Sequence, residues 1–223
     1  FAGYRMYQGE YLAKYYSILP GIIKEKVIEP FINYLPDSRE KKHSEYIRRL
    51  KKFTNGMSGS LAERFYGWQE ICSPDIRQKL IKHHLRDKIS FQEGQEIISQ
   101  KLNEFAGDNI NRMLYVDVKN SLPGDMLTKV DLMSMRNSLE VRVPFLDHEV
   151  VELAFEMEGN VKLKGLKRKY ILMEAFKDIL PPMLHNRPKW GFEMPIGALL
   201  RNELKFLIDD FLSKDFINKQ GFF

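Results

Sequence analysis

Helical periodicity runs along almost the whole chain and limits its fold more than any other feature. Between Gly21 and Leu35, for example, apolar side chains recur at spacings of three and four residues, as on one face of an α-helix. The alternation that would indicate strands is confined to short pieces such as Val141-Arg142-Val143. The chain is therefore predicted to be mainly α-helical. Further helices are predicted at 38–53, 60–71, 73–88, 91–105, 109–121, 125–139, 147–157 and 169–180, and residues 196–212 are predicted to form one helix or a pair of helices.

Proline, glycine and short polar residues mark where these helices should begin and end. Ser73-Pro74 is typical of a helix start, because Ser caps free backbone N–H groups and Pro fits the first helical position. Asp125 and Asp147 are expected to cap the helices that follow them. Pro30 should kink or end the helix that contains it. The triplet Leu122-Pro123-Gly124 should likewise interrupt the chain.

The composition is that of a globular protein. Of the 223 residues, 43% are hydrophobic, including 15 Phe and 10 Tyr, an apolar content that a disordered chain would not carry. No apolar run approaches the roughly 20 residues needed to span a bilayer. Cys72 is the single cysteine, which excludes an internal disulfide and a thiolate metal cluster. A cytoplasmic protein without a membrane partner is therefore expected.

The net charge of +5 is mild, and its densest concentration lies between Arg39 and Lys52. Glu40 and Glu45 interrupt that basic stretch, whose spacing suits the solvated face of a helix better than a nucleic-acid interface. No nucleic-acid partner is therefore predicted. A positive field would also suit a small anionic substrate such as a nucleotide.

Several familiar catalytic motifs are missing from the sequence. It has no glycine-rich phosphate loop, no His-x-x-x-His zinc pair, no Gly-x-Ser-x-Gly elbow and no carboxylate triplet with metal-ligand spacing. His83 and His84 are adjacent and would point about 100° apart on a helix, so they cannot easily share a metal ion. No metal ligand is therefore predicted within this chain.

The helix predicted at 125–139 is unusual because polar residues share one face of an otherwise apolar segment. Asp131, Ser134 and Ser138 follow one another at helical spacing. The helix is rich in Leu, Met and Val, so we expect it to be buried and central. Asp131 should then have a partner, because an unpaired buried carboxylate is costly.

Two charged residues follow that helix on a stretch that should be extended. Glu140 and Arg142 are two positions apart, which places both side chains on the same side of an extended chain. Two interpretations remain open: an internal ion pair that locks the helix to a loop, or part of a binding site.

A second unusual region is the loop Asn186-Arg187-Pro188-Lys189-Trp190-Gly191-Phe192. Its two cations, Arg187 and Lys189, stand in a segment that Pro and Gly restrict and aromatic residues flank. A cation placed in this way could meet a phosphate group with little ordering cost. The alternative is a solvated basic turn.

These stretches resemble the asparagine synthetase family. LPGDMLTKVDLMSM at 122–135, followed by SLEVRVPFLD at 138–147, resembles the family's signature, and RPKWGF at 187–192 resembles its lysine loop. KRKY at 167–170 is similar to the lead-in of the helix before that loop, with Arg168 in place of the usual glycine. FAGY at 1–4 resembles the end of a glycine-acid segment.

The resemblance implies a fold and a domain organisation. Residues 1–223 would be the carboxy-terminal portion of the synthetase domain, cut at both ends from a longer protein. The fold would be the helical half of an α/β adenine-nucleotide α-hydrolase-like (ATP pyrophosphatase) domain, whose strands belong mainly to the missing part. The family's SGGxDS phosphate-binding loop and its amino-terminal glutaminase domain would also lie outside this chain, so the fragment alone is predicted to be inactive.

The resemblance also implies a reaction and roles for individual residues. The family uses ATP and Mg²⁺, bound mainly by the missing part, to convert aspartate into β-aspartyl-AMP, from which ammonia derived from glutamine displaces AMP. Lys189 would be the catalytic cation at the nucleotide phosphates, with Arg187 as a second nucleotide-binding cation. Asp131, Glu140 and Arg142 would contact substrate or support the cleft. A homodimer is compatible with this assignment.

Two other functions remain open on the sequence. A related amide-forming ligase of the β-lactam synthetase type would share the nucleotide chemistry and the loop lysine, although SLEVRVPFLD favours the asparagine branch. A non-catalytic helical interaction module is the alternative of a different class. An SGGxDS loop upstream of Phe1 in the parent gene would favour a ligase over that module.

Overall fold

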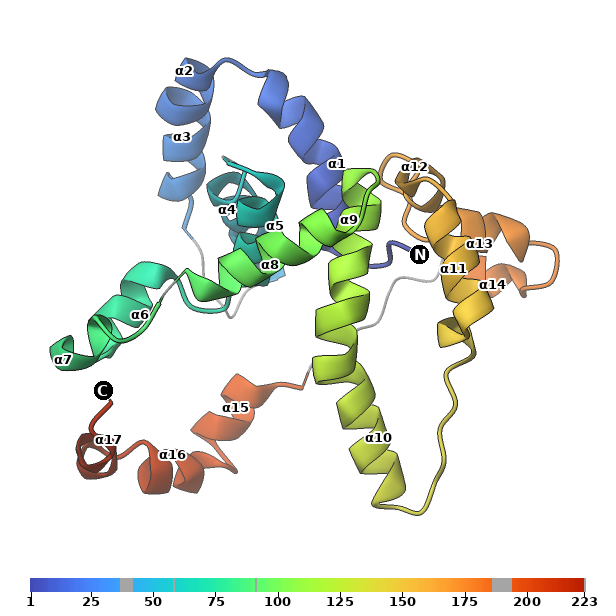
Figure 1. Ribbon diagram of the computed structural model, residues 1–223. Coiled ribbons are helices and arrows are strands. Elements are labelled where there is room, and N and C mark those ends of the chain that lie inside the picture. The colour runs from blue at the N-terminus through green and yellow to red at the C-terminus, as the bar shows by residue number, and fades with distance from the viewer. Residues whose placement is uncertain (37–41, 58, 91, 186–193, 223) are drawn as a thin grey trace. The chain divides into compact units, whose positions relative to one another are not determined.

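The computed structural model describes residues 1–36, 42–57, 59–90, 92–185 and 194–222 (Figure 1). Packing divides the chain into two compact units, the first made of Phe1–Gln69 with Gly94–Pro181 and the second of Glu70–Glu93 with Pro182–Phe223. Within the described residues, the only pairing of extended backbone is an isolated antiparallel bridge between Lys164 and Lys167. The prediction of a mainly α-helical chain is confirmed.

The first unit consists of α-helices with π-helical and 3₁₀ turns between some of them. Its α-helices are α1 (Arg5–Ile18), α2 (Gly21–Ile23), α3 (Glu29–Tyr34), α4 (Lys42–Asn55), α5 (Leu61–Gln69), α8 (Glu93–Glu104), α9 (Asn109–Val116), α10 (Thr128–Met135), α11 (His148–Glu156), α12 (Gly159–Lys162) and α13 (Tyr170–Ala175). The π-helices are η1 (Lys24–Ile28) and η2 (Asp117–Leu127), and η3 (Pro144–Leu146) is a 3₁₀ turn.

The predicted break at Leu122-Pro123-Gly124 is wrong, and Pro30 does not end the helix that contains it. The helical run continues through Pro30, which lies in the first turn of α3, directly after the π-helix η1. Pro123 lies inside the π-helix η2, which joins α9 to α10 without interruption, so Asp125 does not cap a new helix. A proline lacks the N–H that the helix interior requires. The wider π-helical turn accommodates this loss in both places, which sequence periodicity does not reveal.

Of the other predicted caps, Asp147 is confirmed and Ser73 is wrong, because the Ser73 side chain makes no capping hydrogen bond to α6. The Asp147 carboxylate accepts a hydrogen bond from the Glu149 amide and caps α11, as predicted. Asp108 caps α9 by accepting from the amides of Ile110 and Asn111. Because these Asp side chains satisfy amides that have no partner within the helix, they help to fix where α9 and α11 begin.

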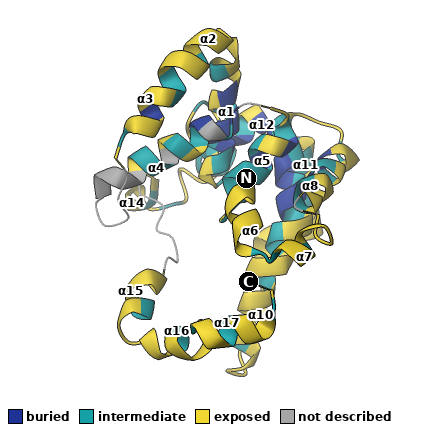
Figure 2. Cartoon of the chain, turned by 90° about the vertical axis from the view of Figure 1, so that its left-hand side faces the viewer, coloured by how far each residue is buried: buried dark blue, intermediate teal, exposed yellow. Residues whose placement is uncertain are grey.

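The core of the first unit lies where α1, α5, α8 and α9 meet (Figure 2). Its fully buried members include Tyr7, Phe65 and Met113, each with at most 1% of its surface exposed. Apolar residues at helical spacing thus produce a real core, although it is confined to part of the unit. The buried cluster comprises Ala2, Tyr7, Ala62, Phe65, Ile98, Leu102, Ile110, Met113, Leu114, Val116 and Leu163.

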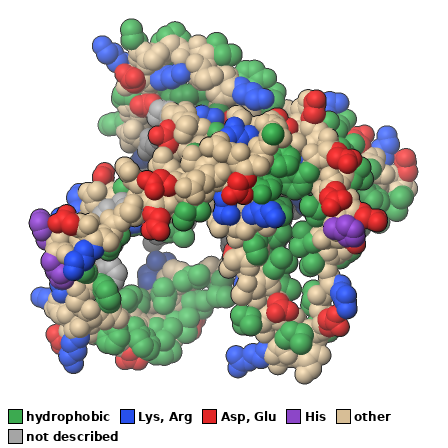
Figure 3. All heavy atoms as spheres, in the orientation of Figure 1, with side chains coloured by type: hydrophobic (Ala, Val, Ile, Leu, Met, Phe, Trp, Pro, Cys, Tyr) green, Lys and Arg blue, Asp and Glu red, His purple; other side chains and the backbone are tan. Residues whose placement is uncertain are grey.

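The second unit has no fully buried residue among those described. Its helices are α6 (Pro74–Leu80), α7 (His83–Arg86), α14 (Pro182–His185), α15 (Ile196–Arg201), α16 (Lys205–Phe211) and α17 (Lys214–Gln220). Pro74 begins α6 as predicted, but the expected helix to residue 88 is divided into α6 and α7. Figure 3 shows apolar side chains at the surface over α15 and α16, where Ile196, Phe206 and Phe211 are more than half exposed. None of the described helices is long and apolar enough to cross a membrane.

Candidate functional site

The two cations of the predicted lysine loop, Arg187 and Lys189, lie outside the described residues. The structure therefore neither places them nor tests their role. The site can be built only from the other predicted residues, Asp131, Glu140 and Arg142, and from polar groups that the structure itself brings together.

Asp131 is exposed on α10, so the prediction of a buried helix around a partnered Asp131 is wrong for this chain. None of the residues of α10 is buried, and Leu132, Met133 and Met135 are between 55% and 58% exposed. Among the described residues, the Asp131 carboxylate has neither a hydrogen-bond nor an ion-pair partner. The sequence analysis identified the apolar character of this helix correctly. Within the described residues, however, α10 packs mainly against η2, the segment that precedes it in sequence.

Glu140 and Arg142 meet on the extended segment after α10, as their spacing predicts. Arg142 Nη2 lies 2.5 Å from Glu140 Oε1. The Glu140 side chain is 68% exposed and the Arg142 side chain is 87% exposed. The pair is therefore not an internal ion pair that holds a helix against a loop. An ion pair in water contributes little to stability. Both groups are therefore available for contacts with a partner or a ligand.

The shared polar face predicted for the 125–139 helix is shorter than expected. The α-helix ends at Met135, and Ser138 has a positive φ of 56° beyond that end. Ser134 donates through its hydroxyl to the carbonyl oxygen of Asp131 and so serves the helix backbone. The three polar residues therefore do not form one continuous helical face.

A buried hydrogen-bonded pair that the sequence analysis missed joins α1 to the start of η2. The Tyr7 hydroxyl donates to Oδ2 of Asp117, and the Ser121 hydroxyl donates to Oδ1 of the same carboxylate at 3.2 Å. Burial raises the pKa of Asp117, and these two hydrogen bonds oppose that rise. Burial and the nearby Asp117 also raise the pKa of Tyr7, so the phenol keeps its proton.

A buried lysine forms a second polar cluster, between α9 and α12. Lys162 is 1% exposed, donates to Oδ1 of Asn111 and lies with Nζ 5.2 Å from the centre of the Phe155 ring. Asn111 in turn donates to the carbonyl oxygen of Met157 at 2.9 Å. Burial lowers the pKa of Lys162 to about 8, since the charged form loses solvation.

A third cluster connects α1, α5 and the start of α9 through a buried carboxylate. Glu10 accepts hydrogen bonds from Arg64 at 2.9 and 3.0 Å, a two-point contact between guanidinium and carboxylate. Asn109 also donates to Glu10 at 2.7 Å. All of these groups are satisfied by one another, which identifies the cluster as structural.

One cavity of about 820 Å³ lies in the first unit beside the start of α9. Asp108 lines it, but its carboxylate already accepts from Ile110, Asn111 and the Gly159 amide at 2.9–3.1 Å. Both polar and apolar residues line this cavity. Other lining residues are Tyr11, Lys14, Phe155, Glu158, Asn160 and Lys164.

Metal-binding side chains do not converge anywhere in the described part of the chain. No group of three or more His, Cys, Asp or Glu side chains there is placed to hold a metal ion. The described site offers cations, polar contacts and exposed apolar surface.

The profile of the asparagine synthase family matches residues 1–223. Asparagine synthetase [glutamine-hydrolyzing] 1 of Bacillus subtilis is 28% identical over 97% of this chain. A protein of Mycobacterium bovis named "Putative asparagine synthetase [glutamine-hydrolyzing]" is 33% identical over 78% of this chain. The amidase chyE of Penicillium rubens is 30% identical over 48% of the chain and 17% of its own length.

These relatives are much longer than this chain. The chain spans 34% of the length of the Bacillus subtilis protein and 27% of that of the Mycobacterium bovis protein. No solved structure shows a significant match.

Proposed function

The chain belongs to the asparagine synthase family, and on that premise we propose that the full-length protein is an ATP-dependent ligase that converts aspartate into asparagine. The single observation that carries this proposal is the family match along residues 1–223. Relatives named as glutamine-hydrolysing enzymes support glutamine as the nitrogen donor. The family has the adenine-nucleotide α-hydrolase-like fold, to which the described residues contribute helices.

The proposed reaction proceeds in two steps. A side-chain carboxylate oxygen of aspartate attacks the α-phosphorus of ATP, and the bond to pyrophosphate breaks, which gives β-aspartyl-AMP. Ammonia released from glutamine then attacks the activated carbonyl, and AMP leaves. A magnesium ion bound with ATP would be held mainly by the part of the protein beyond this chain.

Lys189 is the residue that we assign to the first step. A positive charge near the departing pyrophosphate stabilises the negative charge that develops in the transition state. Lysine suits this role as a point charge. Arg187, two positions earlier, would add a second contact to the nucleotide.

Asp131, Glu140 and Arg142 are proposed to support the cleft in the full-length protein. Their exposure supports contacts with parts of the protein or substrate that lie outside this chain. Exposed apolar side chains on α10 and on the segment after it also support such contacts. In that segment Leu139 and Phe145 are 60% and 57% exposed. We expect the remaining length of the protein to cover them.

Aspartate-dependent exchange of labelled pyrophosphate into ATP, measured on the full-length protein, tests the proposed function. Exchange should require aspartate and Mg²⁺, and asparagine should accumulate when glutamine is added. A polypeptide limited to residues 1–223 should show no exchange, because its sequence holds no glycine-rich phosphate loop. A full-length protein that neither exchanges pyrophosphate nor forms asparagine would exclude the proposal.

A related amide-forming ligase is the second candidate function. The observation that favours it is the similarity to the amidase chyE, a relative with a different name that matches 119 residues. Such a ligase would show nucleotide-dependent exchange with another carboxylic acid and not with aspartate. The acid that supports exchange therefore decides between the two.

A further inference from the structure

Four apolar side chains form a stripe along the helical segment that runs without a break from α2 through η1 into α3. Ile23, Val27, Phe31 and Tyr34 follow one another at spacings of four, four and three residues, so they lie on one side of that segment. They are between 42% and 87% exposed. We call these four side chains the outer stripe. The turn that connects α1 to α2 adds two more exposed apolar side chains, Ile18 and Ile22.

Other side chains of the same segment hold it against α1. Ile32 is buried, and Glu29 Oε1 accepts a hydrogen bond from the Tyr16 hydroxyl at 3.5 Å. Lys24 Nζ donates to the carbonyl oxygen of Ser17 at 3.2 Å. Figure 2 shows mainly exposed residues along α2 and α3 in spite of these contacts. The contacts fix the orientation of the segment, so the outer stripe is presented on a supported helix.

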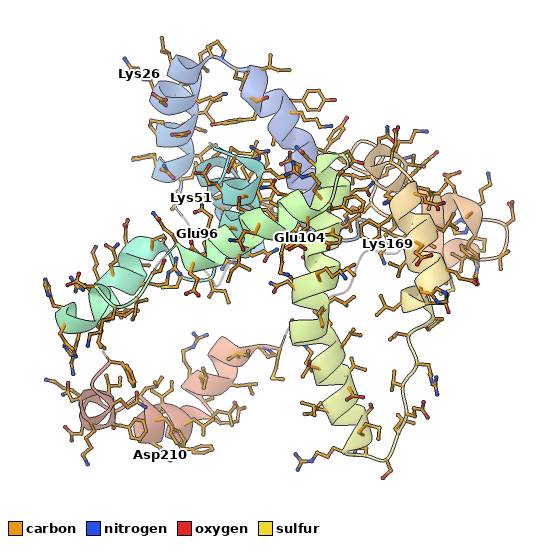
Figure 4. All side chains as sticks on the ribbon, in the orientation of Figure 1. Lys26, Lys51, Glu96, Glu104, Lys169 and Asp210 are labelled. Carbon is orange, nitrogen blue, oxygen red and sulfur yellow. The ribbon has the colours of Figure 1, made fainter. Side chains whose placement is uncertain are left out.

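The sequence around the outer stripe is positively charged. Residues 21–55 hold nine Lys and Arg against five Asp and Glu, a difference of +4 in a chain whose net charge is +5. Lys26 directly precedes Val27, is exposed and projects outward from η1 (Figure 4). An apolar face in a positive segment complements a surface that is both apolar and anionic.

Two other occupants of the outer stripe fit these observations less well. A second copy of the chain would bring two positively charged segments together, and like charges repel one another. Residues that precede Phe1 in a longer protein join the first unit beside Phe145, since the two rings lie 6.2 Å apart. Ile18, at the other end of α1, is about 20 Å from Arg5 in a helix of this length. The preceding part is thus attached beside the segment that follows α10, away from the outer stripe.

We propose that the outer stripe binds the surface of a membrane that contains anionic lipids. The stripe enters the boundary between headgroups and acyl chains, and Lys26 meets the anionic headgroups. Phe31 and Tyr34 suit this boundary, where an aromatic ring can be apolar at one end and hydrated at the other. The expectation of no membrane partner rests on the absence of a membrane span, whereas a helix that lies on a bilayer needs only one apolar face.

Co-sedimentation of the full-length protein with lipid vesicles tests the proposal. The parent protein should bind vesicles of phosphatidylcholine and phosphatidylglycerol in equal parts more tightly than vesicles of phosphatidylcholine alone, and salt should weaken that binding. Phe31→Ser should lower the partition coefficient about tenfold or more, because a buried apolar side chain is lost. Lys26→Ala should lower it about fivefold. Ile71→Ser removes a fully exposed apolar side chain outside the segment and is the matched control, which should bind like the parent protein.

Each alternative gives a different result in the same experiment. Equal vesicle binding by the parent protein, Phe31→Ser and Lys26→Ala, with circular dichroism spectra that agree, would place the membrane contact elsewhere and overturn the proposal. A parent protein that binds neither kind of vesicle would also overturn it. If light scattering then shows a dimer for the parent protein and a monomer for Phe31→Ser, the outer stripe is an interface between copies of the chain.

Discussion

The hydroxyl of Tyr7 donates a hydrogen bond to the carboxylate of Asp117, 110 residues further along the chain. Tyr7 is 1% exposed and Asp117 is 9% exposed, so water does not replace the bond easily if one partner is removed. The bond connects α1 to the junction of α9 and η2, from which the chain continues into α10. It therefore determines how the segment that carries the family signature leaves the core.

Replacing Tyr7 by Phe should lower the free energy of unfolding by about 1–3 kcal/mol, because a buried carboxylate oxygen loses its donor. Urea unfolding followed by circular dichroism measures the change. Asp117→Asn should cost less in the Tyr7→Phe background than in the parent chain, because the pair is then already broken. Equal costs in both backgrounds would show that the two residues are not coupled.

The sequence analysis missed the Tyr7–Asp117 pair, although the position of Asp117 carries a signal that could have been read. Asp117 follows Ile110 by seven positions and Leu114 by three, which places it on the apolar face of the predicted helix and signals a buried charge. No local pattern could identify Tyr7 as its partner, since the two are joined by tertiary packing. The same limit applies to Lys162 and Asn111, which are separated by 51 residues.

The continuation of the helical runs through Pro30 and Pro123 has a different physical origin. Proline rules assume an α-helix, in which the missing N–H breaks the hydrogen-bond pattern. Both prolines here lie in or next to a π-helix, whose different spacing accommodates them. The incorrect burial of α10 came from treating an apolar segment as one with a partner in the same chain. Periodicity shows that a surface is apolar and does not show what covers it.

The stability of the first unit should rise with pH relative to a variant without Lys162. The pKa of Lys162 is lowered to about 8 in the folded chain, from an ordinary value of 10.5. Between these two values the unfolded chain binds a proton that the folded chain does not, so the free energy of unfolding increases with pH. The contribution should approach at most about 1.4 kcal/mol per pH unit.

Urea unfolding of the parent chain and of Lys162→Met between pH 7 and about 10 measures this difference. Lys162→Met keeps the length of the side chain without its charge, so other titrating groups affect both proteins alike. A difference in unfolding free energy that stays constant across the range would show that Lys162 titrates normally in the folded chain.

The exposed ion pair between Glu140 and Arg142 should matter little for stability. Arg142→Ala should change the unfolding free energy by less than about 0.5 kcal/mol, because both side chains are largely in water. In the full-length protein the same variant should lower the rate of asparagine formation, since we assign the residue to the cleft. Lys129→Ala, which breaks an exposed pair with Asp125 on the preceding segment, is the stability control. Unaltered activity of Arg142→Ala would remove the residue from the site.

The apolar surface of α10 should be protected in the full-length protein. Leu132, Met133 and Met135 are more than half exposed in this chain, and the Bacillus subtilis relative is about three times as long as the matched part. Hydrogen–deuterium exchange of residues 128–145 should therefore be slower in the full-length protein than in residues 1–223 alone. Residues 98–102 of α8, which already contribute to the core, serve as the reference. Equal exchange at 128–145 would mean that nothing covers this surface.

Lys189 should be essential for adenylate formation in the full-length protein. It stands between Pro188 and Trp190-Gly191 in a loop whose sequence restricts the backbone, so that the ammonium can be placed before the reaction begins. Lys189→Met keeps most of the bulk of the side chain, Lys189→Ala removes it, and both remove the charge. Loss of one well-placed charge stabiliser costs about 3 kcal/mol of barrier, or roughly a hundredfold in rate. Both variants should therefore lose aspartate-dependent pyrophosphate exchange to this extent, while glutamine hydrolysis, which we expect in a separate domain, continues. Asparagine formation at a near-normal rate by Lys189→Ala would show that the loop is only a solvated basic turn.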